Sequence, residues 1–576
     1  MKKFKKTVSL LLILAMTVTM FAGCGDNGDK KTTTSKGITK KDITKVELAD
    51  EQIFRYAKSS DATGLNPIIC TTAPDNEVSS IIYEGLVRDV ADENNESVQE
   101  PGAAESWDVS EDGCTYTFHI RKDSNWIDGK PVTADDFVYT LRLMSDPKSG
   151  STAGWLYEGV ITNFSEALYK KEGKKPEDIG VKAIDEKTLE ITLVKPCGYF
   201  LELVSSAYPV RQDVYEQYGD SYGSTVDKIM TNGAFKLVKW ENNVKLTYEK
   251  NADYWNADKV KLETIEAKII SETATAAQAL ISGDIDVLYT SDEEWQKMLG
   301  ETEGIEMERS DGNGPEFLSF NCGNKYFKNP KIRMAFSLAI DREKYNKDLR
   351  NNVAEPMYTL MPKVTKVGDK LYNELVNNEN LIVKKQLEEY DPKELLIEGL
   401  KELGLDEDPA KMEVHLSTRG VEEFSKKSSE WLLQEWKEKL GVTIKIDMME
   451  WNIMWEKVEA GDYEIATCGW GPYFNDPYGL LSIYDPEIGY FNSSKTGWTD
   501  ADSKAFRKAL VESTECADQD ERAQILLEAE KLLVGTAVVA PTYTMTDSCY
   551  LSDKIGGYYT NPHSTLDLNK IFVIKK

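Results

Sequence analysis

The first 24 residues limit what this chain can become more than any other stretch. Four lysines among the first six residues precede an uncharged run from Thr7 to Phe21, and small residues and Cys24 follow. A basic start, about fifteen apolar residues and small residues before a break are typical of an export signal. The run is too short to span a bilayer as a permanent helix. Because no other segment reaches about 18 apolar residues, we expect the rest to be a soluble body outside the cytoplasm.

The end of this signal resembles the lipobox of bacterial lipoproteins, in which the signal is cut just before a diacylated cysteine. The small pair Ala22–Gly23 stands before Cys24, although Phe21 occupies a place where leucine is usual. The resemblance implies a signal peptide over residues 1–23 and a lipid on Cys24 that anchors the chain to the outer face of the cell membrane. An ordinary secreted protein with a chance cysteine is the alternative.

Residues 24–45 are polar and contain almost no large apolar side chains. Such a composition cannot bury enough surface to order itself, so it predicts a flexible tether. The whole chain has 69 Lys and Arg against 98 Asp and Glu, a net charge of −29, and removal of residues 1–23 with their four lysines gives −33. A charge of this sign repels nucleic acid, which excludes nucleic-acid partners.

The body that follows the signal, 576 − 23 = 553 residues, is too long for one hydrophobic core and suits two or three domains. Its three histidines, His119, His415 and His563, are isolated, and the eight cysteines show no metal-binding spacing. We therefore expect no metal, no cofactor and no Ser-His-Asp triad. A secreted glycosidase that works with two carboxylates is the main rival class, but 98 acids make such pairs certain by chance.

Helical and strand-like patterns alternate along the body, which favours an α/β or α+β fold. Residues 76–86 place Val78, Ile81, Ile82 and Leu86 on one face of an expected helix. Other helices are expected after Pro330, over the run that stops at Gly441, and over residues 518–535. Strands are expected over 115–121, 442–446 and the run AVVAPTY, and hairpins over 181–193 and 233–250.

Several motifs, in order, resemble the oligopeptide and dipeptide family of extracytoplasmic solute-binding proteins, which serve ABC importers. The stretch over residues 101–140, PGAAESWDVSEDGCTYTFHIRKDSNWIDGKPVTADDFVYT, carries the resemblance most strongly. It continues through IIYEGLVR at 81–88, residues 179–200, 232–256, 281–288 and 320–343, and EWNIMWEKVEAGDYEIATCGWGPYFNDP at 450–477. Essentially the whole body is covered.

The resemblance implies an α/β, two-lobed, type II periplasmic-binding-protein-like hinge fold with an extra subdomain inserted in lobe one. Mapped onto this chain, lobe one takes residues 46–83, 230–318 and 542–576, the extra subdomain takes 84–229, and lobe two takes 319–541. A non-enzymatic monomer is implied, which captures an extended oligopeptide in the cleft between the lobes and delivers it to the permease subunits. An oligosaccharide or another small solute as ligand, or a role as a peptide sensor, is the alternative.

The loop GWGPYFNDP at 469–477 is the first candidate for the binding site. In the family, a glycine–tryptophan pair here is followed by an aspartate that pairs with the α-amine of the peptide. Gly469, Trp470 and Gly471 fit this pattern, but Tyr473 stands where the acid is expected. A phenol ring can attract an ammonium for roughly 0.5–2 kcal/mol but cannot pair with it by charge.

Three ways to hold the ligand therefore stay open. Asp476 could reach the amine, although it could equally only start the Asp-Pro turn. The amine could lie over Tyr473, Trp470 or Phe474, or the ligand could lack a free amine, as a sugar does.

The resemblance also implies seven other positions. Trp451 matches a tryptophan that lines a side-chain pocket, with core packing as the alternative. Thr71, Thr72 and Ala73 occupy the stretch of lobe one that gives strand-like contacts to the ligand. Trp155 lies near an aromatic position of the extra subdomain. Basic residues that meet the ligand's carboxylate in some members fall here on Val458 and Thr467.

Overall fold

The computed structural model describes residues 41–576, apart from residues 71, 93–96, 291, 351, 420–422, 450, 473, 517 and 560–566. The described residues all belong to one compact unit. The predicted signal peptide, the lipid attachment at Cys24 and most of the predicted tether lie outside the described residues. Within the described part of the chain, no helix combines the length and the apolar character that a membrane crossing requires.

One mixed sheet runs through most of the body, and within the described residues it has eleven strands. In spatial order these are β17 (Thr443–Met449), β16 (Glu413–Arg419), β18 (Ile465–Gly469), β12 (Ile305–Phe320), β19 (Val539–Ser552), β11 (Val287–Tyr289), β1 (Ile53–Lys58), β10 (Thr264–Ile269), β9 (Lys245–Lys250) and β8 (Phe235–Glu241), with β13 (Glu355–Pro356) paired to β19. Strands β16, β17 and β18 are parallel to one another, whereas β12 and β19 pair antiparallel.

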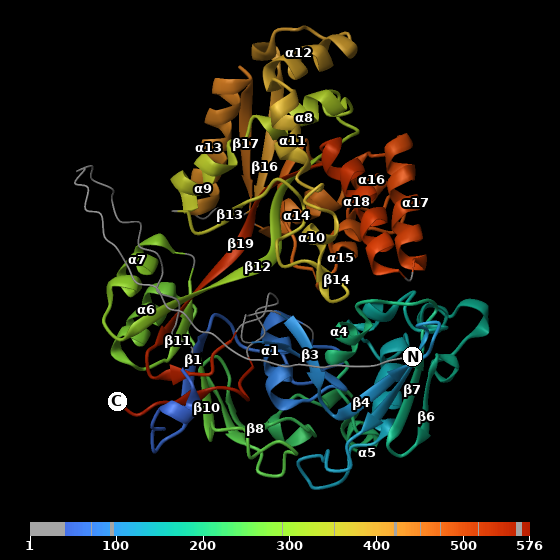
Figure 1. Ribbon diagram of the computed structural model, residues 1–576, viewed down its shortest axis with the longest axis vertical. Helices are drawn as coiled ribbons and strands as arrows, with labels where there is room; N and C mark the ends of the chain where they lie inside the picture. The colour runs from blue at the N-terminus through green and yellow to red at the C-terminus, as the bar shows by residue number, and fades with distance from the viewer. Residues whose placement is uncertain are drawn as a thin grey trace, which may run out of the picture. The chain divides into compact units, whose positions relative to one another are not determined.

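The two long strands β12 and β19 lie side by side and connect the upper and lower groups of elements (Figure 1). Their pairing extends from Ile305 opposite Ser552 to Ser319 opposite Val539, with register shifts between Asp311 and Pro315 and between Glu316 and Phe317. Such irregularities locally disrupt a ladder and bend a strand. The predicted lobe boundaries 318/319 and 541/542 fall on neighbouring rungs of this pair.

A separate antiparallel sheet, in the order β4-β5-β7-β6, belongs to the range predicted as the extra subdomain. Its strands are β4 (Ala104–Val109), β5 (Thr115–Ile120), β7 (Thr188–Thr192) and β6 (Val181–Asp185), and three small sheets pair β2 (Val87–Ala91) with β3 (Ser97–Pro101), β14 (Lys366–Val367) with β15 (Lys370–Leu371), and β20 (Ile555–Gly556) with β21 (Phe572–Val573). The predicted strand over 115–121 and both predicted hairpins are confirmed.

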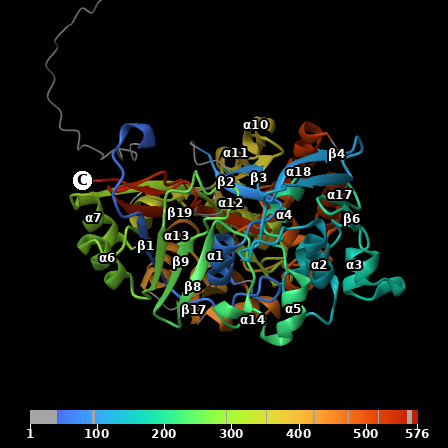
Figure 2. The ribbon, with the colours of Figure 1, turned by 90° about the horizontal axis from the view of Figure 1, so that it is seen from below.

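Helices cover these sheets in both halves of the sequence. The first group is α1 (Ala73–Ile82), α2 (Ala134–Ser145), α3 (Phe164–Leu168), α4 (Phe200–Ser205), α5 (Gln212–Tyr218), α6 (Thr273–Ser282) and α7 (Glu293–Glu301). Figure 2 shows α6 and α7 beside the C-terminal end of the chain and α2 and α3 at the opposite side.

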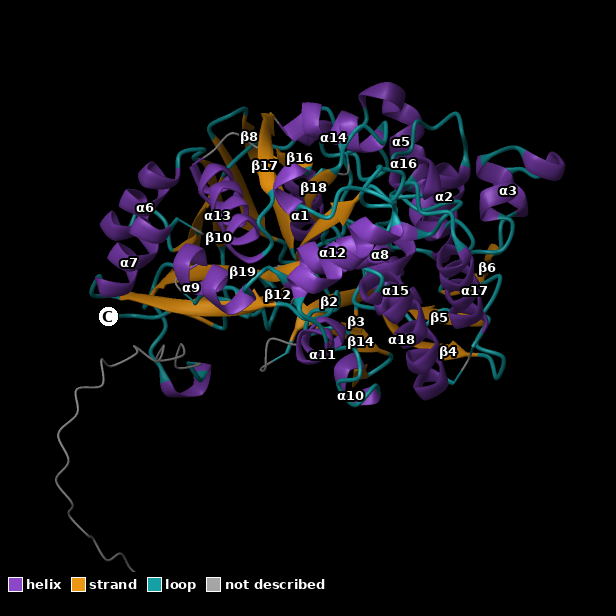
Figure 3. Ribbon diagram, turned by 90° about the horizontal axis from the view of Figure 1, so that it is seen from above, coloured by secondary structure: helices purple, strands orange, loops and turns teal. Residues whose placement is uncertain are grey.

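The second group is α8 (Pro330–Leu338), α9 (Arg342–Arg350), α10 (Tyr372–Leu375), α11 (Ile382–Glu389), α12 (Pro392–Glu402), α13 (Glu423–Lys439), α14 (Trp451–Glu459), α15 (Pro477–Leu481), α16 (Ser493–Thr496), α17 (Ala501–Glu515) and α18 (Gln519–Gly535). Figure 3 shows α13 and α14 on either side of the strands of this half. The predicted helices after Pro330, before Gly441 and over 518–535 are confirmed.

The hydrophobic core consists mainly of two large clusters, which meet near the strand pair β12–β19. One large cluster collects buried residues from the ranges predicted as lobe one and the extra subdomain, and a second collects those from Phe317 to Ala540. The ranges predicted as lobe one and the extra subdomain therefore share one large cluster, and residues between 317 and 540 form another.

The expected helical face over residues 76–86 is wrong at its last position. Helix α1 ends at Ile82, and Leu86 is fully buried beyond the helix rather than on its face. Beyond the helix, Gly85 passes close to the carbonyl of Ser205, where an added Cβ would lie 2.3 Å from the oxygen. Only glycine permits this approach.

A buried carboxylate on α18 holds the segment that leads into α10. Glu530 is fully buried and accepts hydrogen bonds from the Thr359 hydroxyl, from the Leu360 N–H at 2.9 Å and from the Tyr372 hydroxyl at 3.1 Å. Burial raises the pKa of Glu530 to about 7, despite these hydrogen bonds. A group with a raised native pKa stabilises the fold most below its unfolded pKa, and this contribution is lost as the pH rises through the native pKa.

We therefore expect Glu530→Gln to remove one pH dependence of stability. Between about pH 5.5 and about pH 8, the free energy of unfolding of the wild type should fall by about 2 kcal/mol relative to that of the variant, because one pKa unit corresponds to about 1.4 kcal/mol. Calorimetric unfolding of both proteins at the two pH values measures this. Glu528→Gln, at an exposed position of the same helix, is the control and should behave as the wild type. Parallel pH profiles for wild type and Glu530→Gln would contradict the assignment.

Candidate functional site

The loop at 469–477 begins where a buried strand meets the strand pair between the two lobes. Strand β18 lies between β16 and β12, and Gly469 at its end is opposite Glu316 of β12. The next residue, Trp470, donates its backbone N–H to the carbonyl of Pro315 at 3.2 Å. The sheet therefore places the start of the loop at the irregular part of β12, where the lobes join.

Trp470 lies half-buried against the core of lobe two. Its ring is 5.3 Å from that of Tyr490 and 6.3 Å from that of Phe491, centroid to centroid. The indole N–H is buried and has no hydrogen-bond partner among the described residues. Gly471 is exposed, and an added Cβ would meet nothing within 4 Å. The loop thus offers one face of a fixed indole beside an open stretch of backbone.

Asp476 is engaged within lobe two. It is 3% exposed, and its two oxygens accept from the Arg522 guanidinium at 2.6 and 2.8 Å. The same carboxylate accepts from the N–H of Tyr478 at 2.9 Å and so caps α15. Burial by itself lowers the pKa of Arg522, but Asp476 outweighs this and holds that pKa above its usual range. This geometry favours the structural alternative for Asp476, the start of the Asp-Pro turn.

The middle of the loop contacts the extra subdomain. The ring of Phe474 stacks on that of Tyr199, with centroids 3.8 Å apart and planes 6° from parallel. The N–H of Asn475 donates to Glu202 Oε2 at 2.7 Å, and its side-chain amide donates to the carbonyl of Val364 at 2.8 Å. One loop therefore connects the strand pair, the interior of lobe two and the extra subdomain.

The remaining predicted residues lie on separate elements. Thr72 is exposed and precedes α1, where its hydroxyl and N–H donate to Asp75, and Ala73 is the first residue of that helix. A few residues before Thr72, the carbonyl of Ile68 accepts a hydrogen bond from the N–H of Thr152 at 3.2 Å, so this segment contacts the one before Trp155. Trp155 lies in the 3-10 helix Gly154–Tyr157 of the extra subdomain.

Trp451 is the first residue of α14, which follows β17 at the ends of the parallel strands. Thr71 and Tyr473 lie outside the described residues. Val458, where some members of the family carry a basic residue, is fully buried in the core of lobe two. The described structure therefore places Gly469, Trp470, Gly471 and Asp476 on one loop, and it places Thr72 and Ala73 at the start of α1.

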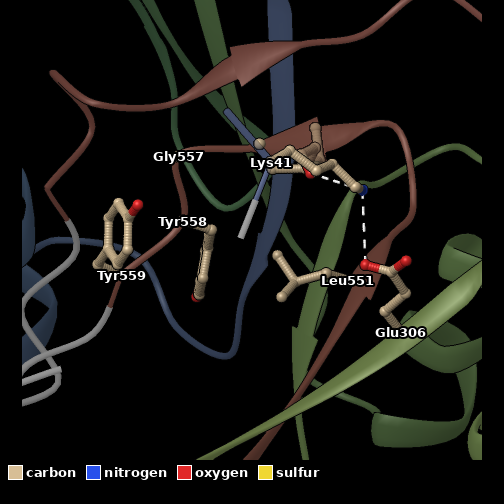
Figure 4. Close-up of a pocket in the computed structure, with 8 residues that line it drawn as sticks. Lys41, Glu306, Leu551, Gly557, Tyr558 and Tyr559 are labelled. Atoms are coloured by element: carbon tan, nitrogen blue, oxygen red, sulfur yellow. Dashed lines mark hydrogen bonds and ion pairs between the residues drawn. The ribbon is translucent and has the colours of Figure 1, made fainter. Parts of the chain in front are cut away.

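A small pocket lies elsewhere, between the start of the described chain and its C-terminal strands (Figure 4). Lys41 forms an ion pair with Glu306 at 3.5 Å, and Leu551 and Tyr558 line the same space. The enclosed volume is about 10 Å³, room for about one water molecule, so it cannot hold a peptide or a sugar. Among the described residues, no group of three or more acidic, histidine or cysteine side chains could hold a metal ion.

Sequence reasoning missed the residues that join the loop to its surroundings, Tyr199, Glu202 and Arg522. Tyr199 lies within a stretch that carries the family resemblance, and Glu202 and Arg522 have the helical spacing of ordinary surface positions. Nothing in a single sequence signals that residues 273 positions apart, such as Glu202 and Asn475, lie in contact.

Comparisons with known proteins agree with the motif order. The family model described as bacterial extracellular solute-binding proteins, family 5 Middle, matches residues 99–490. The dipeptide-binding protein DppE of Bacillus subtilis is 30% identical over 571 residues, 99% of each chain, and the oligopeptide-binding protein OppA of the same organism is 30% identical over 97% of each. Haemophilus influenzae OppA in complex with RPPGFSPFR is similar in structure, with a TM-score of 0.72, 25% identity, and coverage of 92% of this chain and 100% of that one.

Proposed function

The chain belongs to family 5 of the bacterial extracellular solute-binding proteins, and from this premise we propose that it captures extended oligopeptides for an ABC importer. The expected family and the type II periplasmic-binding-protein fold are confirmed. The family is one of extracytoplasmic binding proteins, not of enzymes. A lipid on Cys24, attachment to the outer face of the membrane and delivery to permease subunits belong to the proposal.

One observation carries the proposal: the loop at 469–477 contacts the strand pair β12–β19 through Trp470 and the extra subdomain through Phe474 and Asn475. A solute held at this loop touches parts that move relative to one another when β12 and β19 bend. Such a solute favours the closed arrangement by its differential affinity for the two states. Backbone groups at the end of β18 suit an extended peptide, whose main chain supplies most of the hydrogen bonds.

The proposed ligand-binding set comprises lobe one, extra-subdomain and lobe-two residues. It contains Thr71, Thr72, Ala73, Trp155, Trp451, Gly469, Trp470, Gly471 and Tyr473. Because both oxygens of Asp476 accept from Arg522, we propose that a free amine lies over the ring faces of the loop rather than on this carboxylate. The domain ranges predicted from the motifs belong to the same proposal.

Native mass spectrometry of protein purified without denaturation tests the proposal. A ladder of peptide masses bound to the chain is the expected result, followed by a smaller radius of gyration in solution scattering when such a peptide is added back. Increments of hexose mass would support an oligosaccharide ligand instead. A scattering profile unmoved by any peptide or glycan mixture, or cleavage of those molecules by the chain, would contradict the binding function.

A further inference from the structure

The extra subdomain and lobe two contact each other directly. We call this contact the latch, and it consists of Lys195, Tyr199 and Glu202 on the extra subdomain and Phe474, Asn475 and Thr514 on lobe two. Lys195 donates to the Thr514 hydroxyl, Tyr199 stacks on Phe474 and Glu202 accepts from the Asn475 N–H. The latch thus combines one ring stack with two hydrogen bonds.

Glu202 is the group in the latch that the proposed binding mechanism does not use. It lies on α4, which packs against β2, and the residue is half-buried. Asp89 of β2 and Asp476 of lobe two disfavour a negative charge there, whereas Lys366 of β14 and the Asn475 N–H favour it. Burial together with the two acids outweighs these favourable partners and raises the pKa of Glu202 to about 8.

Separation of the two surfaces removes Asp476 and much of the burial, whereas Asp89 of β2 stays on the same side as Glu202. Phe474, Asn475 and Asp476 leave together because they belong to lobe two, and water then reaches the carboxylate. Its pKa falls toward the ordinary value of 4.5 for a glutamate. Formation of the latch is therefore accompanied by the uptake of a proton in the interval between these two values.

We propose that Glu202 is a positioning residue, which holds the backbone of the binding loop at Asn475 and makes the latch between the extra subdomain and lobe two proton-linked. This inference rests on the proposed function, because it concerns the loop that holds the solute. The latch is strongest at a pH below the pKa that Glu202 has when the surfaces are separated. It weakens as the pH rises toward and through the higher pKa that Glu202 has in the latch. Mild acidity thus favours the arrangement in which the loop is held.

The consequence for binding follows from population arithmetic. A solute that requires the positioned loop binds only to molecules in which the latch is formed. Its apparent affinity is therefore the intrinsic affinity multiplied by the fraction of such molecules. Alkaline pH lowers that fraction without changing any contact between loop and solute. The pH dependence of binding is then caused by Glu202, a residue outside the proposed ligand-binding set.

Hydrogen–deuterium exchange of the segment 470–480 tests the proposal in the full exported chain. Wild type and Glu202→Gln are compared at the same pH, so that the intrinsic exchange rates cancel. Glutamine keeps the size and the acceptor oxygen of Glu202 and carries no charge at any pH. We expect nearly equal exchange at about pH 4, below the ordinary glutamate pKa, and at least about tenfold faster exchange in the wild type at about pH 9, because a one-proton linkage changes an equilibrium up to tenfold per pH unit.

Two further variants separate the titration from simple damage. Glu177→Gln, at an exposed position of the extra subdomain, should follow the wild type at both pH values. Tyr199→Ala removes the ring stack and should speed exchange at both. The proposal is overturned if Glu202→Gln shows the same alkaline rise as the wild type, or if neither protein changes with pH. Compaction by added peptide in solution scattering reports the proposed function separately, so that function can stand if the latch does not titrate.

Discussion

Arg522→Ala is expected to lower the free energy of unfolding of lobe two by about 3–5 kcal/mol, the usual cost of removing one partner from a buried ion pair. Arg522 is 4% exposed and Asp476 is 3% exposed, and the guanidinium contacts both carboxylate oxygens. Without it, the carboxylate stays buried, and among the described residues only the N–H of Tyr478 at the start of α15 still donates to it. Arg522 also donates to the carbonyl of Ser513, so α17 and α18 lose a connection. Urea unfolding followed by circular dichroism measures the effect.

Two variants provide the comparison for Arg522→Ala. Lys508→Ala removes an exposed pair with Glu512 on α17, where we expect a loss of no more than about 0.5 kcal/mol. The double variant Asp476→Asn with Arg522→Met removes both charges and keeps a capping oxygen, so it should be more stable than Arg522→Ala alone. A double variant that is no more stable than Arg522→Ala would show that the unpaired charge is not the cause.

Trp470→Ala is expected to weaken binding of the co-purified solute at least about 30-fold, which corresponds to the roughly 2 kcal/mol typical of an aromatic residue that dominates an interface. The indole is fixed by Tyr490 and Phe491, so no ordering cost arises when a solute lies against it. The buried N–H, without a partner among the described residues, is lost as a donor at the same time. Calorimetric titration with a peptide identified by native mass spectrometry measures the affinity.

The control must separate lost binding from lost stability, because Trp470 also packs against the core of lobe two. Trp295→Ala removes a comparable half-buried indole on α7 of lobe one. Its affinity for the same peptide should match the wild type at a temperature where both variants are folded. Trp470→Phe keeps an aromatic face and should lose less than Trp470→Ala. Unchanged affinity in Trp470→Ala would remove the loop from the site.

Local patterns predicted most elements of this protein because they depend on neighbours in the chain. The alternation over 115–121 identifies β5, and the apolar spacing after Pro330 identifies α8. The same reasoning failed at Leu86, which is buried in the core beyond the end of α1 rather than on its face. Helical spacing shows that a residue is buried, but it does not show which element buries it.

The candidate site was predictable only in part. The motif order located the loop, and the substitution of Tyr473 for the family's acid raised the question of how an amine is held. The alternatives for Asp476 could be weighed only when Arg522, 46 positions away, was found on the same carboxylate. The contacts of Phe474 with Tyr199 and of Asn475 with Glu202 connect parts of the chain more than 270 positions apart.

From the sequence alone, the α/β class, most helices and strands, and the family could be predicted, since these depend on composition, periodicity and motif order within short windows. The tertiary structure alone decided which charges are paired, which side chains hold the binding loop, and where the pKa of an ordinary glutamate rises. These properties depend on distance and burial in three dimensions, and a carboxylate such as Glu202 acquires them only when residues remote in the chain surround it.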